Sequence, residues 1–152
     1  MSKWGLLVGG VLLAGVVVAG WQAIQPSPTQ QSHSMVTPDT SDIAVGDPIE
    51  DVRLPVELSS NAVIGKRAFD AKCASCHGAN AAGQNGVAPP LVHKIYEPGH
   101  HSDEAFQRAA KSGVRAHHWQ FGNMPPVSGL TRGDVQHIAL YVRELQRAHG
   151  ID

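Results

Sequence analysis

The sequence predicts an all-α domain over residues 60–152, after an apolar N-terminal segment and a linker. Three segments of this domain carry apolar residues at the spacing of an amphipathic helix. Each begins with Ser, Thr, Asn or Asp residues, whose side chains accept hydrogen bonds from the free N–H groups of a first helical turn. No stretch alternates apolar and polar residues as a strand would. We therefore expect about three main helices joined by loops.

The first predicted helix spans roughly residues 60–74. Ser59, Ser60 and Asn61 are candidate N-caps. Its apolar residues at helical spacing are Ile64, Ala68, Phe69 and Ala71. A loop should follow it, because Gly78, Gly83 and Gly86 lack the steric restriction that would favour a helix.

The second predicted helix begins at Ser102 and ends at Gly113. Asp103 and Glu104 stand in its first turn and Lys111 in its last turn. These charges favour a helix because they have the opposite sign to the partial charge of the helix end that each occupies.

The last predicted helix runs from Thr131 to Gly150. Thr131 and Asp134 have the spacing of a capping box, with Asp in place of the usual Glu. Its apolar stripe should pack on the first helix near Gly65, where the missing side chain lets two backbones approach closely. The stripe consists of Val135, Ile138, Ala139, Val142 and Leu145.

The chain has two cysteines, Cys73 and Cys76, and they lie in the run Cys-Ala-Ser-Cys-His. This C-x-x-C-H spacing lets two thiols bond the vinyl groups of one haem while His77 binds its iron. A zinc site would need more thiolates than the chain has. A thioredoxin-like dithiol would lie among alternating strands and helices, which residues 61–152 do not show. The motif therefore predicts one covalently attached haem c, the remaining alternative being a structural pair of small residues.

A haem bound through His77 needs a second axial ligand if it is to carry electrons without an open iron position. Met124 is the only methionine after the attachment motif. It precedes Pro125 and Pro126, which fix φ and lack backbone donors, so the loop around it should be rigid. Met124 is thus the predicted iron ligand. A methionine that only fills a gap is one alternative, and ligation by His117 or His118 is another.

Together with these motifs, residues 60–149 resemble the class I c-type cytochromes, which are small, mono-haem and ligated by His and Met. Gly65 and Phe69 resemble the glycine and aromatic pair that packs on the last helix in that family, and Tyr141 resembles its aromatic partner. Pro89-Pro90-Leu91 is similar to the family's Pro-x-Leu. The resemblance implies that helices and loops pack around the haem, and that the carbonyl of Pro89 accepts a hydrogen bond from His77, which orients the ring.

His/Met ligation raises the reduction potential relative to two imidazoles. The resemblance then implies a one-electron shuttle between redox proteins that act as donor and acceptor, with no enzymatic activity and no small-molecule substrate. A fixed haem subunit of a membrane oxidoreductase complex is an alternative. A gas sensor or peroxidase is another, if the sixth iron position is open.

The N-terminal segment, residues 4–24, contains no charged residue. Its length is close to the roughly 20 apolar residues that span a bilayer, and exceeds the usual signal-peptide core of about 7–15. Trp4 and Trp21 would lie near the two membrane interfaces. A signal peptide cleaved near Ala19 is the alternative. We expect residues 1–24 to be a transmembrane anchor or export signal, with the haem domain in the bacterial periplasm or otherwise outside the cytoplasmic membrane.

Residues 25–59 are rich in Pro, Ser and Thr and hold six acidic residues and one basic residue. We interpret them as a largely disordered tether between the anchor and the haem domain of residues 60–152. As a flexible coil, about 34 residues would reach roughly 30–35 Å. Part of the segment could instead lie on the haem domain as an extended arm. The formal net charge of −1 and the lack of a basic run give no support for nucleic-acid binding.

Nine histidines are a high number for this length, and four of them form two adjacent pairs, His100 with His101 and His117 with His118. One interpretation is that His100 and His101 form a polar helix entry, while His117, His118 and Trp119 cover the haem or bond its propionates. Arg115 and Trp119 are the candidates for propionate contacts. A second metal site for copper or zinc is the other interpretation. The sequence argues against it, because adjacent side chains point in different directions on most backbones.

Overall fold

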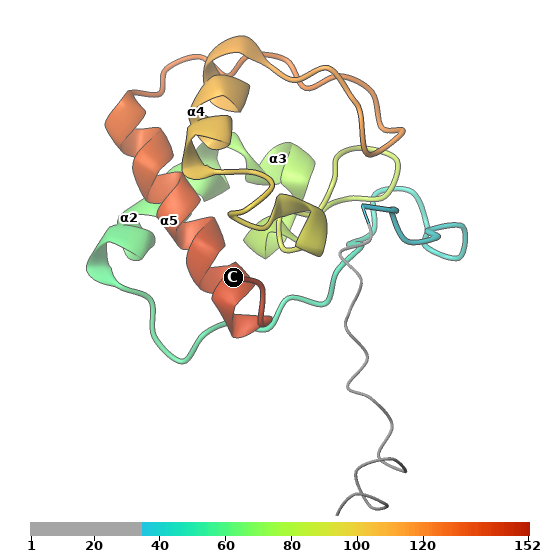
Figure 1. The fold of residues 1–152 in the computed structure, drawn as a ribbon, viewed down its shortest axis with the longest axis horizontal. Helices are drawn as coiled ribbons and strands as arrows, with labels where there is room; N and C mark the ends of the chain where they lie inside the picture. The colour runs from blue at the N-terminus through green and yellow to red at the C-terminus, as the bar shows by residue number, and fades with distance from the viewer. Residues whose placement is uncertain (1–34) are drawn as a thin grey trace, which may run out of the picture. The chain divides into compact units, whose positions relative to one another are not determined.

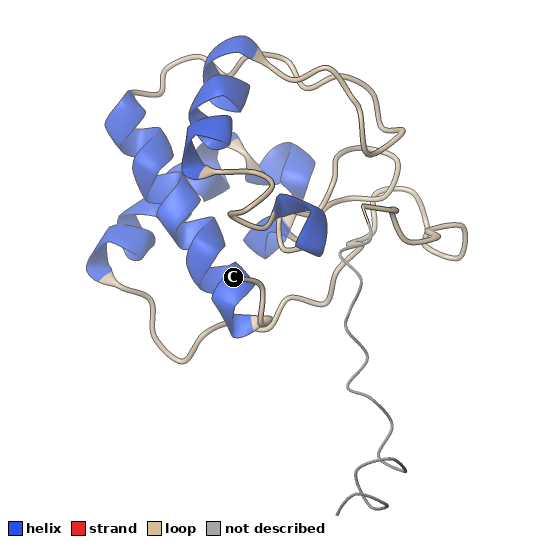
Figure 2. Ribbon diagram, in the orientation of Figure 1, coloured by secondary structure: helices blue, strands red, loops and turns tan. Residues whose placement is uncertain are grey.

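The computed structural model describes residues 35–152 (Figure 1). In this part the chain forms four α-helices and two short 3-10 turns, and the rest is loop (Figure 2). The elements are α2 (Ser60–Lys72), α3 (Ala74–His77), η1 (Ala79–Ala81), η2 (Lys94–Tyr96), α4 (Asp103–Ser112) and α5 (Arg132–Ala148). Residues 35–152 contain no strand, so the predicted all-α fold is confirmed.

Helix α2 starts at the predicted cap. The Ser59 hydroxyl accepts a hydrogen bond from the backbone N–H of Ala62 at 3.2 Å, and it donates one to the Glu144 carboxylate of α5 at 2.6 Å. The cap therefore also joins the start of α2 to α5.

Helices α2 and α5 cross at Gly65, as the sequence predicts. A Cβ atom on Gly65 would lie 1.9 Å from the carbonyl oxygen of His137, so only glycine permits this approach. Near this crossing, the rings of Phe69 and Tyr141 meet edge to face with centroids 5.7 Å apart. Both rings are fully buried and form the centre of the core together with Ala62, Ile138, Val142 and Leu145.

Helix α5 opens with the predicted capping box. The Thr131 hydroxyl accepts from the backbone N–H of Asp134 at 3.2 Å, and the Asp134 carboxylate accepts from the backbone N–H of Thr131 at 2.8 Å. The Thr131 hydroxyl also donates to the Asp134 carboxylate at 2.7 Å; this bond, and then the one from the Thr131 backbone, lower the pKa of Asp134. The box satisfies two backbone donors that a helix start otherwise leaves to water.

Helix α4 begins after Ser102, but the Ser102 side chain makes no capping hydrogen bond. The start of this helix is held by α5 instead: Arg143 donates to Asp103 at 2.8 Å, and Arg132 donates to both oxygens of Glu104 at 3.1 and 2.9 Å. Asp103 and Glu104 thus form ion pairs with arginines of α5, and their negative charges also lie at the positive end of the α4 dipole.

Part of the predicted tether lies on the helical domain. The backbone of Gly46 donates to Asn85 at 2.9 Å, and that of Asn85 donates to Asp47 at 2.9 Å. The Asn85 amide also donates to the Ile43 carbonyl at 2.7 Å. Further along, the backbone N–H of Arg53 donates to the His149 ring at 2.8 Å. We call residues 40–59 the docked arm.

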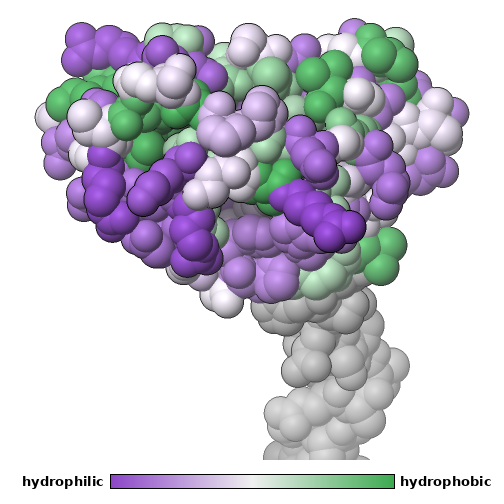
Figure 3. Space-filling model, turned by 90° about the horizontal axis from the view of Figure 1, so that it is seen from above, coloured by the Kyte–Doolittle hydropathy of each residue, from purple (hydrophilic) through white to green (hydrophobic). Residues whose placement is uncertain are grey.

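The predicted membrane segment, residues 4–24, lies outside the described residues. Within residues 35–152, no helix is both long and apolar enough to cross a membrane. On the face of this part seen in Figure 3, hydrophilic and hydrophobic residues are interspersed.

Candidate functional site

The C-x-x-C-H motif forms a single helical turn directly after α2. The backbone N–H groups of Cys76 and His77 donate to the Cys73 carbonyl at 3.1 and 2.8 Å. Residues three and four positions apart on a helix share a face, so the backbone of this turn places Cys73, Cys76 and His77 on the same side. Cys73 and Cys76 are free thiols, half-buried and exposed respectively. Burial, and then the neighbouring Cys76, raise the pKa of Cys73 to about 11, so this thiol stays protonated at neutral pH.

His77 is buried, and one of its ring nitrogens is hydrogen-bonded to the backbone. Nδ1 lies 2.9 Å from the Pro89 carbonyl oxygen, which can only accept, so Nδ1 carries the proton. Burial lowers the pKa of His77, and the bond to Pro89 only partly opposes this. The neutral ring therefore has its lone pair on Nε2, the atom that an iron ion would take.

The attachment turn is held from the other side by Gln84, which the sequence interpretation missed. Its side-chain nitrogen donates to the carbonyls of Ser75 and Cys76 at 3.0 and 2.9 Å. These are carbonyls at the end of a helical turn, where partners within the helix are lacking. Because a glycine-rich loop follows His77, the sequence indicates that these carbonyls need hydrogen-bond donors from outside the helix. No spacing rule identifies Gln84 as that donor.

Met124 lies at the base of a closed loop, residues 114–124. Its backbone N–H donates to Val114 at 3.0 Å and its carbonyl accepts from Val114 at 2.9 Å. Gly113 makes this pairing possible: its φ is +74°, and a Cβ there would lie 2.4 Å from the Met124 oxygen. The bond from the Ala116 N–H to the Asn123 side chain, at 2.9 Å, closes the loop further. These hydrogen bonds therefore hold the Met124 backbone in place, in agreement with the rigid loop that the two following prolines predict.

The same loop carries Arg115 and Trp119, which the sequence proposes as propionate contacts. Arg115 is exposed, and its guanidinium makes no hydrogen bond or ion pair to residues 35–152. Trp119 is buried between His93, at 5.6 Å edge to face, and Phe121, stacked at 5.4 Å. Its indole nitrogen is the one buried side-chain polar atom of the described residues without a hydrogen-bond partner. Burial raises the pKa of the nearby Tyr96; the Trp119 N–H, which approaches the Tyr96 hydroxyl without reaching hydrogen-bond geometry, partly opposes this effect.

These residues fit a covalently attached haem. The turn offers two free thiols and one neutral imidazole with a free lone pair, which is the donor set that haem attachment requires. The unpartnered Trp119 N–H is a donor that an added carboxylate would satisfy, because buried polar groups in proteins nearly always have partners.

Comparison with known proteins agrees with this geometry. The family model for cytochrome c matches residues 62–146, a range that contains the attachment turn and Met124. No curated protein shows significant similarity to the chain, and neither does any solved structure.

Proposed function

The chain belongs to the cytochrome c family, and we propose that it is a mono-haem class I member whose iron is held by His77 and Met124. Membership implies a covalently attached haem c, a role in electron transfer, and redox proteins as partners. When bound, the haem supplies the one-electron change between ferric and ferrous iron. Cys73 and Cys76 would hold it through thioether bonds.

The observation that carries the proposal is the hydrogen bond from His77 to Pro89. It fixes the tautomer and the orientation of the ring, and it makes the free nitrogen more basic. The Pro89 carbonyl belongs to the backbone and cannot follow the ring, so rotation of the ring would break this bond. Such a fixed ligand suits a carrier, whose coordination should change little when the iron gains or loses an electron.

Met124 is supported as the second ligand by its backbone. The pairing with Val114 on one side and the two prolines on the other hold the residue at a defined place. A thioether ligand raises the reduction potential, so the proposal includes a positive potential.

The absorption spectrum of the oxidised protein tests the ligand pair. Methionine ligation gives a weak sulfur-to-iron charge-transfer band at the red edge, and we expect this band in the protein with attached haem. It should disappear in Met124→Ala, because alanine has no sulfur to give the iron. Met35→Ala is the matched control and should keep the band. If the band is absent from the unchanged protein or survives Met124→Ala, the assignment of Met124 is wrong.

We further propose that the carrier is tethered to the outer face of a membrane and exchanges electrons there with membrane or exported redox proteins. The support is the uncharged segment of residues 4–24, whose length suits a bilayer. Attachment of a haem to two thiols is also a reaction of exported proteins in the class that the chain resembles. The proposal places the haem domain in the periplasm or an equivalent compartment.

A further inference from the structure

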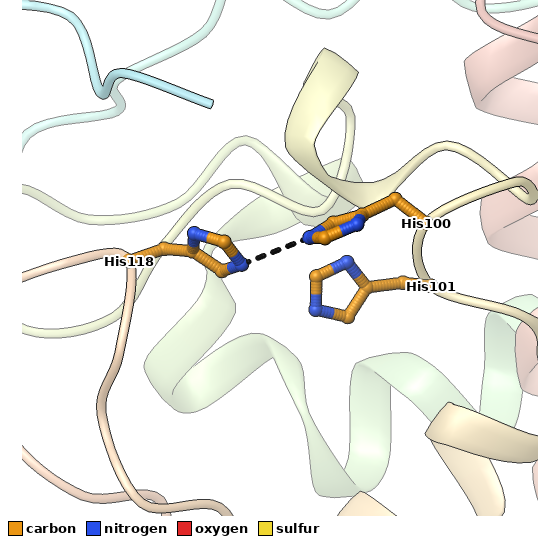
Figure 4. A group of neighbouring side chains, drawn as sticks. All are labelled: His100, His101 and His118. Atoms are coloured by element: carbon orange, nitrogen blue, oxygen red, sulfur yellow. Dashed lines mark hydrogen bonds between the residues drawn. The ribbon is translucent and has the colours of Figure 1, made fainter. Parts of the chain in front are cut away.

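We propose that His100, His101 and His118 form a second metal site, which binds one Cu²⁺ or Zn²⁺ ion independently of the haem. Each of the three residues offers a ring nitrogen, and these nitrogens lie within 4.8 Å of one another (Figure 4). Such a site has a role separate from electron transfer and leaves the haem to Cys73, Cys76, His77 and Met124. It excludes the alternative in which His118 binds the haem iron.

The three rings converge from two separate segments. His100 and His101 lie on the turn before α4, where both of their backbone N–H groups donate to the Glu97 carbonyl, at 3.1 and 2.8 Å. This tight turn brings the adjacent rings to 4.6 Å between centroids, nearly perpendicular to each other. The expectation that adjacent histidines diverge is therefore wrong at this pair. His118 comes from the loop of residues 114–124, and its ring faces both of the others (Figure 4).

The distances suit a small cation. His100 Nε2 and His118 Nε2 are 3.2 Å apart, so at most one of them carries the shared proton and the other presents a lone pair. Two ring nitrogens that bind one zinc ion at about 2.0–2.1 Å in tetrahedral geometry lie roughly 3.4 Å apart. The first pair is already close to this separation. His101, whose nitrogen lies within 4.8 Å of the other two, would complete the site after moving closer to them by up to about 1.4 Å.

One ring nitrogen of His101 is hydrogen-bonded to the backbone. Its Nδ1 donates to the Ile95 carbonyl at 2.7 Å, which leaves Nε2 with the lone pair. A backbone carbonyl is a common partner for the second nitrogen of a metal-bound histidine. Arg143 of α5 holds the same turn by donating to the carbonyls of His101 and of Tyr96, the latter at 2.7 Å.

The charge state also suits a cation. Burial, and then the neighbouring histidines, lower the pKa of His118; burial is likewise the largest cause that lowers the pKa of His101. Both rings are therefore neutral at neutral pH, and a neutral imidazole is the form that binds metal. The positive charge of Arg143, which also faces His101, is partly offset by its ion pair with Asp103 at 2.8 Å.

Imidazole ligands suit copper and zinc, and Cu²⁺ binds a given nitrogen site more tightly than the other divalent metals of its row. We therefore expect Cu²⁺ to bind more tightly than Zn²⁺. His117 lies beside the cluster, but its Nδ1 donates to the Arg115 carbonyl and it is not one of the converging residues.

The test is a calorimetric titration of the haem-loaded protein, previously treated with a chelator, with Cu²⁺ and separately with Zn²⁺. We expect one ion per chain, and at least a tenfold loss of affinity in His100→Gln and in His118→Gln. These two residues are preferred to His101, whose ring also bonds Ile95. His137→Gln, on α5, is the matched control and should bind the metal with unchanged affinity. His117→Gln should lose less affinity than His100→Gln or His118→Gln.

Absence of binding, or an equal loss in His137→Gln or His117→Gln, would overturn the site. The charge-transfer band of the haem is recorded in the same samples. If His118→Gln alters this band before any metal is added, His118 belongs to the iron and the second site is wrong. If the band is missing while copper binds as expected, the metal site stands and only the Met124 assignment fails.

Discussion

The Trp119 indole nitrogen is buried without a partner in the part of the chain that the structure describes, although the ring itself packs tightly. An unpaired buried donor costs roughly 1–3 kcal/mol, so such a group is expected to have a partner in the mature protein. A haem propionate is the partner that we propose.

Trp119→Phe should keep the aromatic packing and lower the reduction potential. Without the N–H donor, the negative charge of the propionate would be less compensated, and this favours ferric iron. A redox titration of the haem-loaded protein measures the change. Phe121→Leu, which alters the same stack without touching a donor, is the control. An equal potential in Trp119→Phe and the unchanged protein would refute the propionate contact.

His93 predicts a pH dependence of stability. Its Nδ1 accepts a hydrogen bond from the Ile95 N–H at 3.2 Å, and burial lowers the pKa of the ring. The unfolded chain therefore takes up a proton at higher pH than the folded protein does. The stability that this neutral ring contributes is present above the unfolded pKa of about 6.5 and is lost as the pH falls through the lower folded value.

His93→Asn should reduce this acid sensitivity, because asparagine can accept the same hydrogen bond without titrating. Between pH 7.5 and 5.5, we expect the unchanged protein to lose more unfolding free energy than the variant. Urea unfolding of the haem-loaded protein at both pH values measures it. Equal losses in the two proteins would show that His93 does not contribute.

At the scale of elements, the crossing of α2 and α5 depends on Gly65. The atom that a Cβ would meet belongs to the backbone of α5, so no side-chain rotation can relieve the clash. Because α2 leads directly into the attachment turn, a shift of this crossing would also displace the turn.

Gly65→Ala should destabilise the domain by about 1–3 kcal/mol, the usual cost of overpacking. Gly133→Ala is the control. A Cβ on Gly133 would have only one ordinary contact, 3.7 Å from Thr131 Oγ1, and alanine favours a helix. Urea unfolding should show a loss in the first variant and none in the second. A neutral Gly65→Ala would mean that the crossing adjusts without cost.

The elements that the sequence predicts are those that depend on local spacing. The capping box of Thr131, the cap at Ser59 and the close approach at Gly65 each follow from neighbouring residues or from one missing side chain. Gln84 and the cluster of His100, His101 and His118 were not predictable in this way. Each depends on how loops fold back on one another, and the convergence at His118 joins residues eighteen positions apart.

At the scale of the whole molecule, the proposed anchor is testable without knowledge of its structure. If residues 4–24 remain as a membrane anchor, the intact mass of the protein isolated from membranes should correspond to the complete N-terminal segment plus one haem. Mass spectrometry of the protein from the expressing cells measures this. Loss of about the first 19 residues would mean a cleaved export signal and would remove the anchor from the proposal.

The docked arm changes how far a tethered haem domain could travel. Residues 40–59 are hydrogen-bonded to the domain, for example through Asn85 and His149. If the proposed tether behaves as a coil, docking of residues 40–59 leaves at most about 15 of its about 34 residues for its reach. That reach grows as the square root of the length, so it falls by about one third. Effective concentration varies roughly as the −3/2 power of length, so a membrane partner within reach would experience the haem domain at about threefold higher concentration.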